Sequence, residues 1–134
     1  MSLYSLENYS VENIANRLTI EEHRNKRFVF VDYKGLREKE MIELENLHLA
    51  LTLRDKLPFL ADYHNTYITS GYLCHGKRFI ELTKGVIDKG AFIGVDQIKS
   101  WILKGILLEY NVNYKSFENK ELAIDFLTNT NDHK

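Results

Sequence analysis

The sequence predicts an α/β domain with a mostly parallel sheet of four or five strands, flanked by helices. Four short runs rich in β-branched or aromatic residues recur along the chain, and a segment with helical periodicity follows each run. No linker rich in glycine, serine or proline interrupts this alternation, and 134 residues is an ordinary length for one domain. Strand–helix repeats with apolar strands favour a parallel sheet covered by helices. We therefore expect a single domain over residues 1–134.

The expected elements follow from where each periodic pattern begins and ends. Strands are predicted over 28–31, 59–61, 91–95 and 113–117, and helices over 38–56, 70–89, 96–110 and 119–127. We expect the first helix to end before Pro58, because proline has no N–H to donate to the hydrogen bonds of a helix. Ser70, Asp96 and Asn119 are expected to cap the N-termini of the later helices, and Gly90 is expected to end the second helix.

The N-terminal third departs from this rhythm. Residues 10–18 fit a short helix with one apolar side, made of Val11, Ile14, Ala15 and Leu18. Residues 19–23 alternate weakly, and Arg24-Asn25-Lys26 can turn the chain back into the first strand. We expect a helix and a hairpin over about residues 10–33, with an antiparallel edge strand, and βα repeats over about 28–128. The tail over 129–134 is expected to fray.

The composition narrows the possible partners and compartments. The formal net charge is −1, with Lys and Arg scattered among Asp and Glu, so a face for nucleic acid is not expected. No apolar stretch approaches the ~20 residues that span a bilayer, and a signal peptide is not apparent. Cys74 is the only cysteine, which excludes an intrachain disulfide and predicts a free, buried thiol. We expect a cytoplasmic protein without a cofactor.

Three aspartates each follow an expected strand. Asp32, Asp62 and Asp96 recur about one βαβ unit apart, and His64 follows the second of them. Ligands of open α/β sheets bind at this carboxyl edge, and clustered carboxylates there can hold Mg²⁺ for reactions of phosphate esters. The adjacent acid pair and the lysine of a phosphoaspartate receiver are missing, however, because Tyr33 and Tyr63 follow the first two aspartates. We therefore favour the interpretation that these aspartates end strands and cap turns, and we expect no metal.

Two further motifs lack a necessary part. Residues 71–78 have the glycine and lysine spacing of a phosphate-binding P-loop, but Arg78 replaces the hydroxyl residue that ligands Mg²⁺. Cys74 and His75 are neighbours, and adjacent residues on a helix point about 100° apart, which separates a nucleophile from its base. We expect no catalytic residues.

Residues 59–71, FLADYHNTYITSG, resemble the strand-to-helix corner of STAS domains, the fold of anti-sigma-factor antagonists. The resemblance extends over residues 28–127 to small bacterial STAS-like proteins, through VDYKGL at 31–36 and the closing segment at 114–127. It implies a core sheet with helices and a role in protein docking or small-ligand binding, without catalysis.

The same resemblance implies a regulatory position at the start of the second helix. Thr69 aligns with the serine that signalling STAS proteins phosphorylate, with Ser70 and Gly71 beside it, whereas Ile68 stands in place of an aspartate. Phosphate at a helix N-terminus is electrostatically favourable. Capping of the helix by Thr69 or Ser70 explains the same residue types, and we favour it.

The third helix is apolar nearly all round, with Ile98, Trp101, Ile102, Leu103, Ile106, Leu107, Leu108 and Tyr110. Such a helix needs a second apolar contact, which can be another helix of the chain, another subunit, a membrane surface or a lipophilic ligand.

Three functions follow from these patterns. The leading hypothesis is a non-enzymatic regulatory module that docks a protein partner, or a second copy, through Thr69–Gly71 and the third helix. The second is a membrane-associating protein or a carrier of a lipophilic ligand, in which Tyr63, Tyr67, Trp101, Ile102 and Leu108 form the pocket or interface. The third is an Mg²⁺-dependent phosphate-ester enzyme that uses the aspartates.

Overall fold

A computed structural model describes residues 14–129 and confirms the predicted α/β class. Five strands form one sheet: β1 (Leu18–His23), β2 (Lys26–Asp32), β3 (Phe59–Asp62), β4 (Gly90–Ile93) and β5 (Tyr114–Ser116). Four helices connect and follow them: α2 (Glu38–Asp55), α3 (Ser70–Thr83), α4 (Gln97–Tyr110) and α5 (Lys120–Thr128). None of the helices in this part of the chain is long and apolar enough to cross a membrane.

The strands lie in the sheet in the order in which they occur in the chain. β1 pairs antiparallel with β2, and every later pair is parallel, as the sequence predicted. The β1–β2 turn contains two residues, Arg24 and Asn25, with φ of 54° and 63°. Positive φ at both central residues is typical of the type I′ hairpin turn, whose twist matches that of the flanking strands. Lys26, expected in the turn, already pairs with His23.

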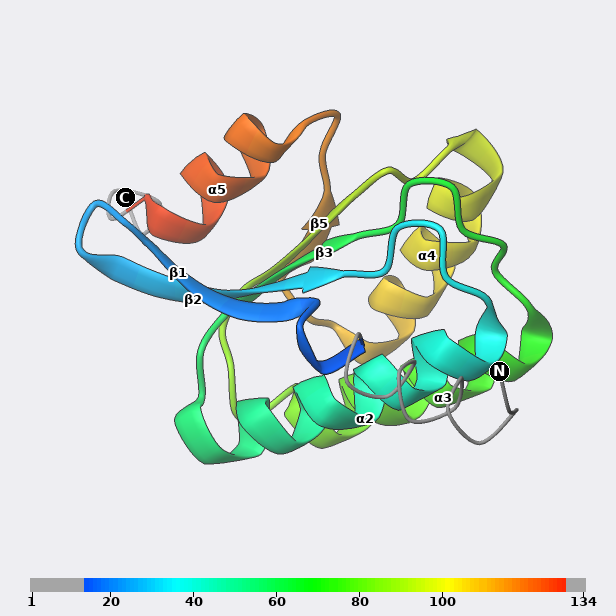
Figure 1. The fold of residues 1–134 in the computed structure, drawn as a ribbon. Coiled ribbons are helices and arrows are strands. Elements are labelled where there is room, and N and C mark those ends of the chain that lie inside the picture. Colours follow the sequence, from blue (N-terminus) through cyan, green and yellow to red (C-terminus); the bar gives the residue numbers. More distant parts are fainter. Residues whose placement is uncertain (1–13, 130–134) are drawn as a thin grey trace, which may run out of the picture.

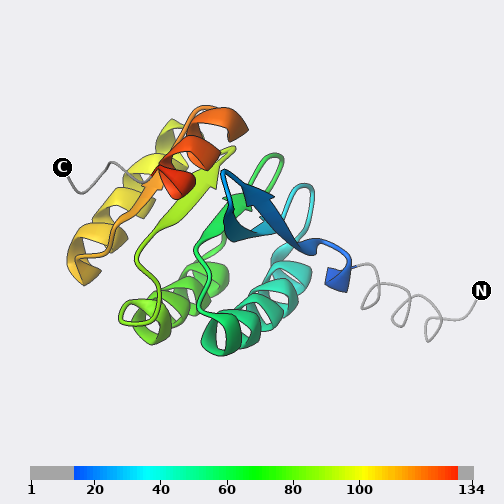
Figure 2. The same cartoon turned by 90° about the vertical axis from the view of Figure 1, so that its left-hand side faces the viewer.

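The helices cover both faces of the sheet. Figures 1 and 2 show α2 and α3 on one side and α5 on the other. Val29, Val31 and Ala61 point into the larger core, where side chains of α2, α3 and α4 pack. The alternate residues Phe28 and Leu60 point into a smaller core with α5. The central strands β3 and β4 are almost entirely buried and apolar, because helices cover both of their faces.

Some predicted boundaries are wrong. α3 ends at Thr83 and not at residue 89, because the chain turns there, with the amides of Val86 and Ile87 bonded to the Thr83 carbonyl. Gly90 does not end a helix but begins β4, where a Cβ atom would lie 2.5 Å from the Phe59 ring. Leu18 begins β1 and does not belong to a helix.

Parts of two other predictions lie outside the described residues. Of the helix expected over residues 10–18, positions 10–13 fall outside that range, whereas Ile14 and Ala15 are helical. Of the tail expected to fray, residues 130–134 fall outside it.

Candidate functional site

The corner between β3 and α3 is closed by Thr69. Its hydroxyl accepts a hydrogen bond of 3.2 Å from the Tyr72 amide and donates one to a Glu38 carboxylate oxygen. The N-cap of α3 is therefore Thr69, and the expectation that Ser70 caps this helix is wrong. Ser70 is exposed in the first position of the helix.

Gly71 gives Glu38 room to approach the N-terminus of α3. A Cβ atom at Gly71 would lie 2.5 Å from Glu38 Oε1. A carboxylate in this place is favourable, because helix N-termini carry a partial positive charge. The place that a phosphate on Thr69 would need is thus already next to a negative charge.

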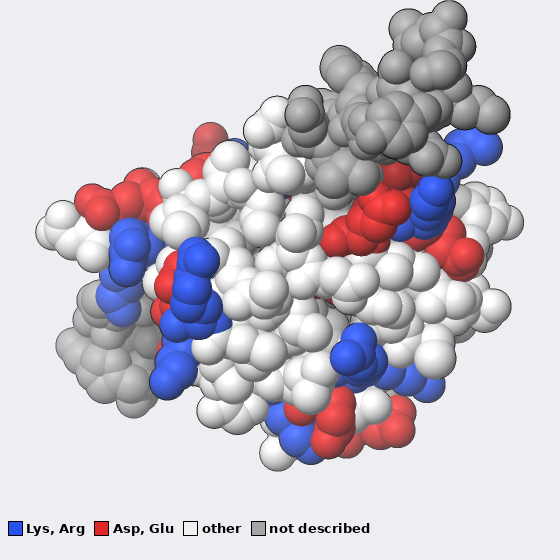
Figure 3. Space-filling view, turned by 60° about the horizontal axis from the view of Figure 1, so that its bottom comes forward, with Lys and Arg blue, Asp and Glu red and all other residues white. Residues whose placement is uncertain are grey.

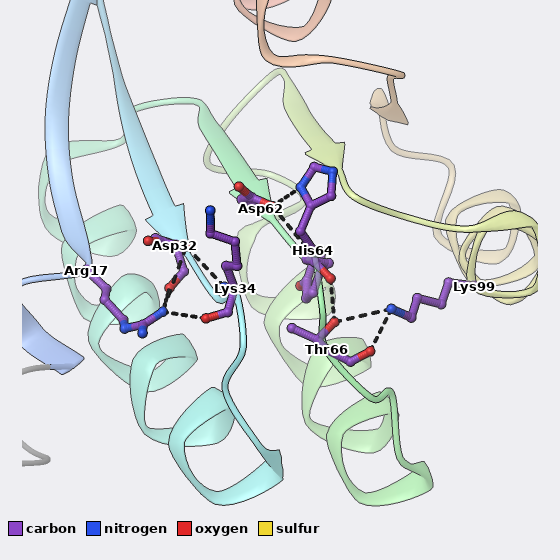
Figure 4. Close-up of polar contacts among 8 residues, drawn as sticks. Arg17, Asp32, Lys34, Asp62, His64, Thr66 and Lys99 are labelled. Carbon is purple, nitrogen blue, oxygen red and sulfur yellow. Dashed lines mark hydrogen bonds and ion pairs between the residues drawn. The ribbon is translucent and has the colours of Figure 1, made fainter.

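The carboxyl edge of the sheet carries the predicted aspartates, but each carboxylate has a local partner, and Figure 4 shows the partners of Asp32 and Asp62. Asp32 accepts a hydrogen bond from the Lys34 amide and lies 3.8 Å from the Arg17 guanidinium. Asp62 accepts from the His64 amide at 2.9 Å, and its Oδ1 lies 2.6 Å from His64 Nδ1.

Asp96 caps α4, as predicted, by accepting a 2.9 Å hydrogen bond from the Lys99 amide. The Lys99 ammonium donates to the Thr66 carbonyl across 2.7 Å, which ties the loop after β3 to the first turn of α4 (Figure 4). Within residues 14–129, no three His, Cys, Asp or Glu side chains form a group that could hold a metal ion.

The stretch with P-loop spacing is helical throughout. All of residues 71–78 lie within α3, so their amides point along the helix and cannot surround a phosphate as a loop would. Cys74, expected to be buried, is an exposed free thiol on this helix. His75 next to it contacts Glu45 of α2.

α4 has one inward and one outward side. Leu107 is buried, and Leu103 and Ile106 pack against the main core. Trp101 and Leu108 are 74% and 82% exposed, and Ile102 is 40% exposed. Among residues 14–129, the predicted second contact of this helix is therefore not made for Trp101 and Leu108. Figure 3 shows the side on which α2 and α3 lie, where neither Lys and Arg nor Asp and Glu form a continuous patch.

A cavity of about 80 Å³ lies between the sheet and helices α2, α3 and α4. Its walls are largely apolar and aromatic, and they include the side chains of Tyr33, Glu45, His48, Tyr63, Tyr72 and Ile106. The lining residues that are not buried include Leu73 and Gly76 of α3 and Ile102 of α4, so the cavity has an opening between these two helices.

The polar groups of this cavity form a chain centred on Glu45. The Tyr72 hydroxyl donates to Glu45 Oε2 at 3.0 Å and lies 2.6 Å from the Tyr63 hydroxyl. His75 Nδ1 lies 3.2 Å from Glu45 Oε1. The Tyr63 ring stacks on that of Tyr33, with centroids 4.8 Å apart. Helices α2 and α3 and the ends of β2 and β3 thus meet around one buried carboxyl.

Burial sets the protonation of these groups. Burial raises the pKa of Glu45 from 4.5 to about 7, although its hydrogen bonds with Tyr72 and His75 act in the opposite direction. Burial also raises the pKa of the Tyr63 and Tyr72 hydroxyls and lowers the pKa of His48 from 6.5 to about 3. At neutral pH the tyrosines and His48 are uncharged, and Glu45 is close to half protonated.

The structure separates the residues predicted to form one pocket. Tyr63 and Ile102 line the cavity. Trp101 and Tyr67 do not line it, and Leu108 borders a different surface hollow beside β5. Glu45 and His48 were not predicted as site residues, although the α2 pattern carried a signal: these polar residues fall on the same helical stripe as the buried Met41, Leu44 and Thr52.

Comparisons with known proteins identify the fold. No family model matches the chain, and no curated protein matches it. Among solved structures, an uncharacterized protein of the DUF3478 family with a SpoIIAA-like fold, from Shewanella loihica PV-4, matches with a TM-score of 0.65 and 16% identity. The match covers 82% of this chain and 91% of that one. An anti-sigma-factor antagonist (STAS) domain protein from Planctomyces limnophilus matches with a TM-score of 0.60 and 14% identity, over 82% and 97% of the two chains. At these identities the similarity establishes the fold alone, and the chain has the STAS-like fold that the resemblance of residues 28–127 implied.

Proposed function

We propose that this chain is a non-enzymatic binding module that docks a partner protein through the outward side of α4. We call Trp101, Ile102 and Leu108 the docking face. The observation that carries the proposal is the exposure of Trp101 and Leu108 on a helix whose other side, at Leu103, Ile106 and Leu107, packs on the core. Tryptophan is enriched among the residues that dominate the binding energy of protein interfaces. A STAS-like fold supports a regulatory or binding role of this kind.

The surroundings of the docking face suit a protein better than a membrane. Lys104 and Glu109 are exposed on the same helix and offer one charge of each sign as a polar rim. Lys99 is already bonded to Thr66, so α4 has little cationic charge to attract anionic lipid. A partner with an apolar patch and few charges at its centre fits this surface.

The loop before α3 extends the proposed surface. Tyr67 is 81% exposed and lies between Thr66, which contacts Lys99 of α4, and Thr69, which caps α3. Ser70 and Gly71 are exposed at the end of this loop. We include Tyr67 and Ser70–Gly71 as a secondary contact. A regulatory modification here fits Ser70 better than Thr69, whose hydroxyl bonds Glu38 and the Tyr72 amide.

Photo-crosslinking in the native host followed by affinity measurement tests the proposal. A benzophenone amino acid replaces Trp101 in one protein and Leu53 in another, because Leu53 is an exposed leucine of α2 outside the docking face. We expect a crosslinked protein from position 101 only. The purified partner should then bind Leu108→Ser at least roughly tenfold more weakly than wild type, which corresponds to a typical interface hot spot, and should bind Leu53→Ser with unchanged affinity.

Two results would count against a docking role for α4. One is equal crosslinking from positions 53 and 101, and the other is an unchanged affinity of Leu108→Ser for the crosslinked protein. Light scattering at several concentrations shows whether the partner is a second copy, because the mass would then rise with concentration in wild type and not in Leu108→Ser. Location in the cytoplasm stays a prediction.

A further inference from the structure

The buried carboxyl of Glu45, in the wall of the cavity, has no Lys or Arg partner among residues 14–129. The Tyr72 hydroxyl donates to its Oε2, and His75 Nδ1 lies 3.2 Å from its Oε1. His75 balances the negative charge only when its imidazole is protonated. Buried carboxylates are usually paired with a cation, so Glu45 forms one half of an ion pair.

The Glu45 carboxyl lies next to the opening of the cavity. Gly76 belongs to this opening, and a Cβ atom on Gly76 would be 3.9 Å from Glu45 Oε2. Because glycine has no side chain, this position leaves the carboxyl uncovered, and the Glu45 side chain is still 6% exposed. A carboxylate has about four acceptor positions, of which Tyr72 and His75 occupy two. Donors of an entering molecule can therefore bond it.

The rest of the lining suits an organic cation. The rings of Tyr33, Tyr63 and Tyr72 form one cluster in the wall, with each pair of centroids between 4.8 and 6.0 Å apart. Aromatic rings attract cations, so these tyrosines support the Glu45 carboxylate in binding one. The helices on either side of the opening contribute aliphatic side chains, which can contact an alkyl chain: Leu73, Leu103 and Ile106.

Lys99 is a cationic member of the lining, but its charge is directed away from Glu45. Its ammonium donates to the Thr66 carbonyl across 2.7 Å and lies 4.0 Å from Asp96 Oδ2. Within the described range Lys99 forms no ion pair with Glu45, so the negative charge of Glu45 is left for a ligand to neutralise.

The size of the cavity limits the ligand to a short chain. The cavity measures about 80 Å³, and one water molecule needs about 10–15 Å³ of such space. A few non-hydrogen atoms therefore fit inside, and the end of the chain can extend through the opening between α3 and α4. A primary ammonium group is compact and has three N–H donors for a carboxylate.

We propose that this cavity binds a small alkylammonium ion, with its ammonium group bonded to the Glu45 carboxylate and its alkyl chain between α3 and α4. Ile102 belongs both to the cavity lining and to the docking face, so the two surfaces adjoin. The cation site does not rest on the docking role, however, because Glu45 and the tyrosines that form it are buried, and Leu108 borders a different hollow.

Butylammonium and 1-butanol are the probes, because they share an alkyl chain and differ by an ammonium group in place of a hydroxyl group. Each is titrated into the full chain at pH 8 while the methyl resonances of the cavity lining are followed by NMR. We expect saturable shifts at Leu73, Leu103 and Ile106. Butylammonium should bind roughly tenfold tighter than 1-butanol, the gain typical of a hydrogen bond to a charged group. Absence of saturable shifts with butylammonium, or equal affinities of the two probes, would overturn the proposal.

The affinity for butylammonium should depend on pH through Glu45. Burial raises the pKa of Glu45 to about 7, so this carboxyl is largely ionised at pH 8 and largely protonated at pH 5. An alkylammonium ion is charged at both pH values, as a lysine side chain is. Protonation of His75 at low pH acts in the same direction, and burial keeps the other titrating groups that face Glu45 uncharged: Tyr33, His48, Tyr63 and Tyr72. Butylammonium should therefore bind at least roughly tenfold more weakly at pH 5, with 1-butanol unchanged, and equal affinities of butylammonium at both pH values would contradict the proposal.

Two variants locate the bound probe. Glu45→Gln keeps the shape of the side chain but removes its charge, and should abolish the preference for butylammonium while 1-butanol still binds. Gly76→Leu covers the opening and should weaken binding of both probes. A preference for butylammonium that persists in Glu45→Gln contradicts the site, and if that variant does not fold, unaltered binding of both probes to Gly76→Leu does so instead.

Two controls separate this site from other carboxylates and from the docking face. Glu81→Gln removes an exposed carboxylate of α3 outside the cavity lining and should leave both affinities unchanged. Leu108→Ser alters the docking face away from the cavity, and butylammonium should bind it as tightly as wild type. A docking role that fails therefore leaves the cation site intact, and an equal loss of butylammonium binding in Glu81→Gln and Glu45→Gln would overturn the assignment to Glu45.

Discussion

The Tyr72 hydroxyl donates a hydrogen bond of 3.0 Å to Glu45 Oε2, and both side chains are buried between α2 and α3. No cationic Lys or Arg side chain bonds this carboxyl in the described part of the chain. Hydrogen bonds alone do not compensate for burial of the charge, so the pKa of Glu45 rises from 4.5 to about 7. The helix pair therefore has a titrating group at its centre.

Replacing Glu45 should change how stability depends on pH. A raised pKa means that the folded chain binds more protons than the unfolded chain between about pH 4.5 and pH 7. The free energy of unfolding therefore falls as pH rises through this range and levels off above it. The shift corresponds to roughly 3 kcal/mol, at 1.36 kcal/mol per pH unit. Glu45→Gln keeps the shape of the side chain but does not titrate. Over this pH range its free energy of unfolding should therefore fall less than that of wild type, by about that amount.

Urea denaturation of both proteins at intervals from pH 4 to pH 8 measures this difference. Contributions of the other titrating groups cancel when the Glu45→Gln curve is subtracted from the wild-type curve. Parallel curves would show that folding leaves the pKa of Glu45 unchanged.

The two hydroxyl residues at the start of α3 should differ in their effect on stability. Thr69→Ala removes the acceptor for the Tyr72 amide and the donor to Glu38, and should lower the free energy of unfolding by about 1 kcal/mol, within the range typical of N-caps. Ser70→Ala changes an exposed side chain and should stay within about 0.5 kcal/mol of wild type. Chemical denaturation distinguishes the two, and an equal loss for both variants would contradict capping by Thr69 alone.

Local patterns predicted the sheet, because a short apolar run followed by a segment with helical periodicity recurs along the chain. The runs of β3 and β4 are buried on both faces, so their apolar composition alone favours parallel strands, whereas β5 is buried only at Tyr114 and gave the weaker pattern. The caps Asp96 and Asn119 were predictable for a similar reason, since a capping side chain bonds an amide three residues away in the same chain. For α3 the sequence left Thr69 and Ser70 as alternative caps, and the N-cap is Thr69, one position before the Ser70 expected from the helix boundary.

The cavity was not predictable in the same way, because its contacts join distant segments. Glu45 and its partners Tyr72 and His75 lie about thirty residues apart, on two helices whose relative rotation no local pattern fixes. The exposure of one side of α4 was unpredictable for the same reason, because it too depends on packing between distant segments. An apolar helix indicates a need for a second contact, but only packing decides that Leu107 is buried and that its neighbour Leu108 is not.

This difference between neighbours on α4 gives a direct test of the helix orientation. Leu107→Ala removes buried methyl groups from the core and should cost about 2–5 kcal/mol, as large-to-small core substitutions do. Leu108→Ala should change the free energy of unfolding by less than about 0.5 kcal/mol in the isolated protein. Thermal or urea unfolding of the two variants measures both values. The opposite order would mean that α4 presents Leu108 to the core, and the docking face would then be lost.

Gly94, just after β4, should be the least replaceable of the glycines near the carboxyl edge. Its φ is +74°, and a Cβ atom there would collide with the His64 amide, which Asp62 also binds. Gly94→Ala must adopt a left-handed conformation, at about 1–2 kcal/mol, and also displace the loop that carries His64. Gly105 provides the matched control, because it lies within α4 with open space around its Cα, and alanine there should stabilise the helix by about 0.5–1 kcal/mol. Opposite signs of the two changes in unfolding free energy, with altered NMR shifts of His64 in Gly94→Ala alone, are the expected result. A neutral Gly94→Ala variant would show that the loops after β3 and β4 are not packed as closely as this contact requires.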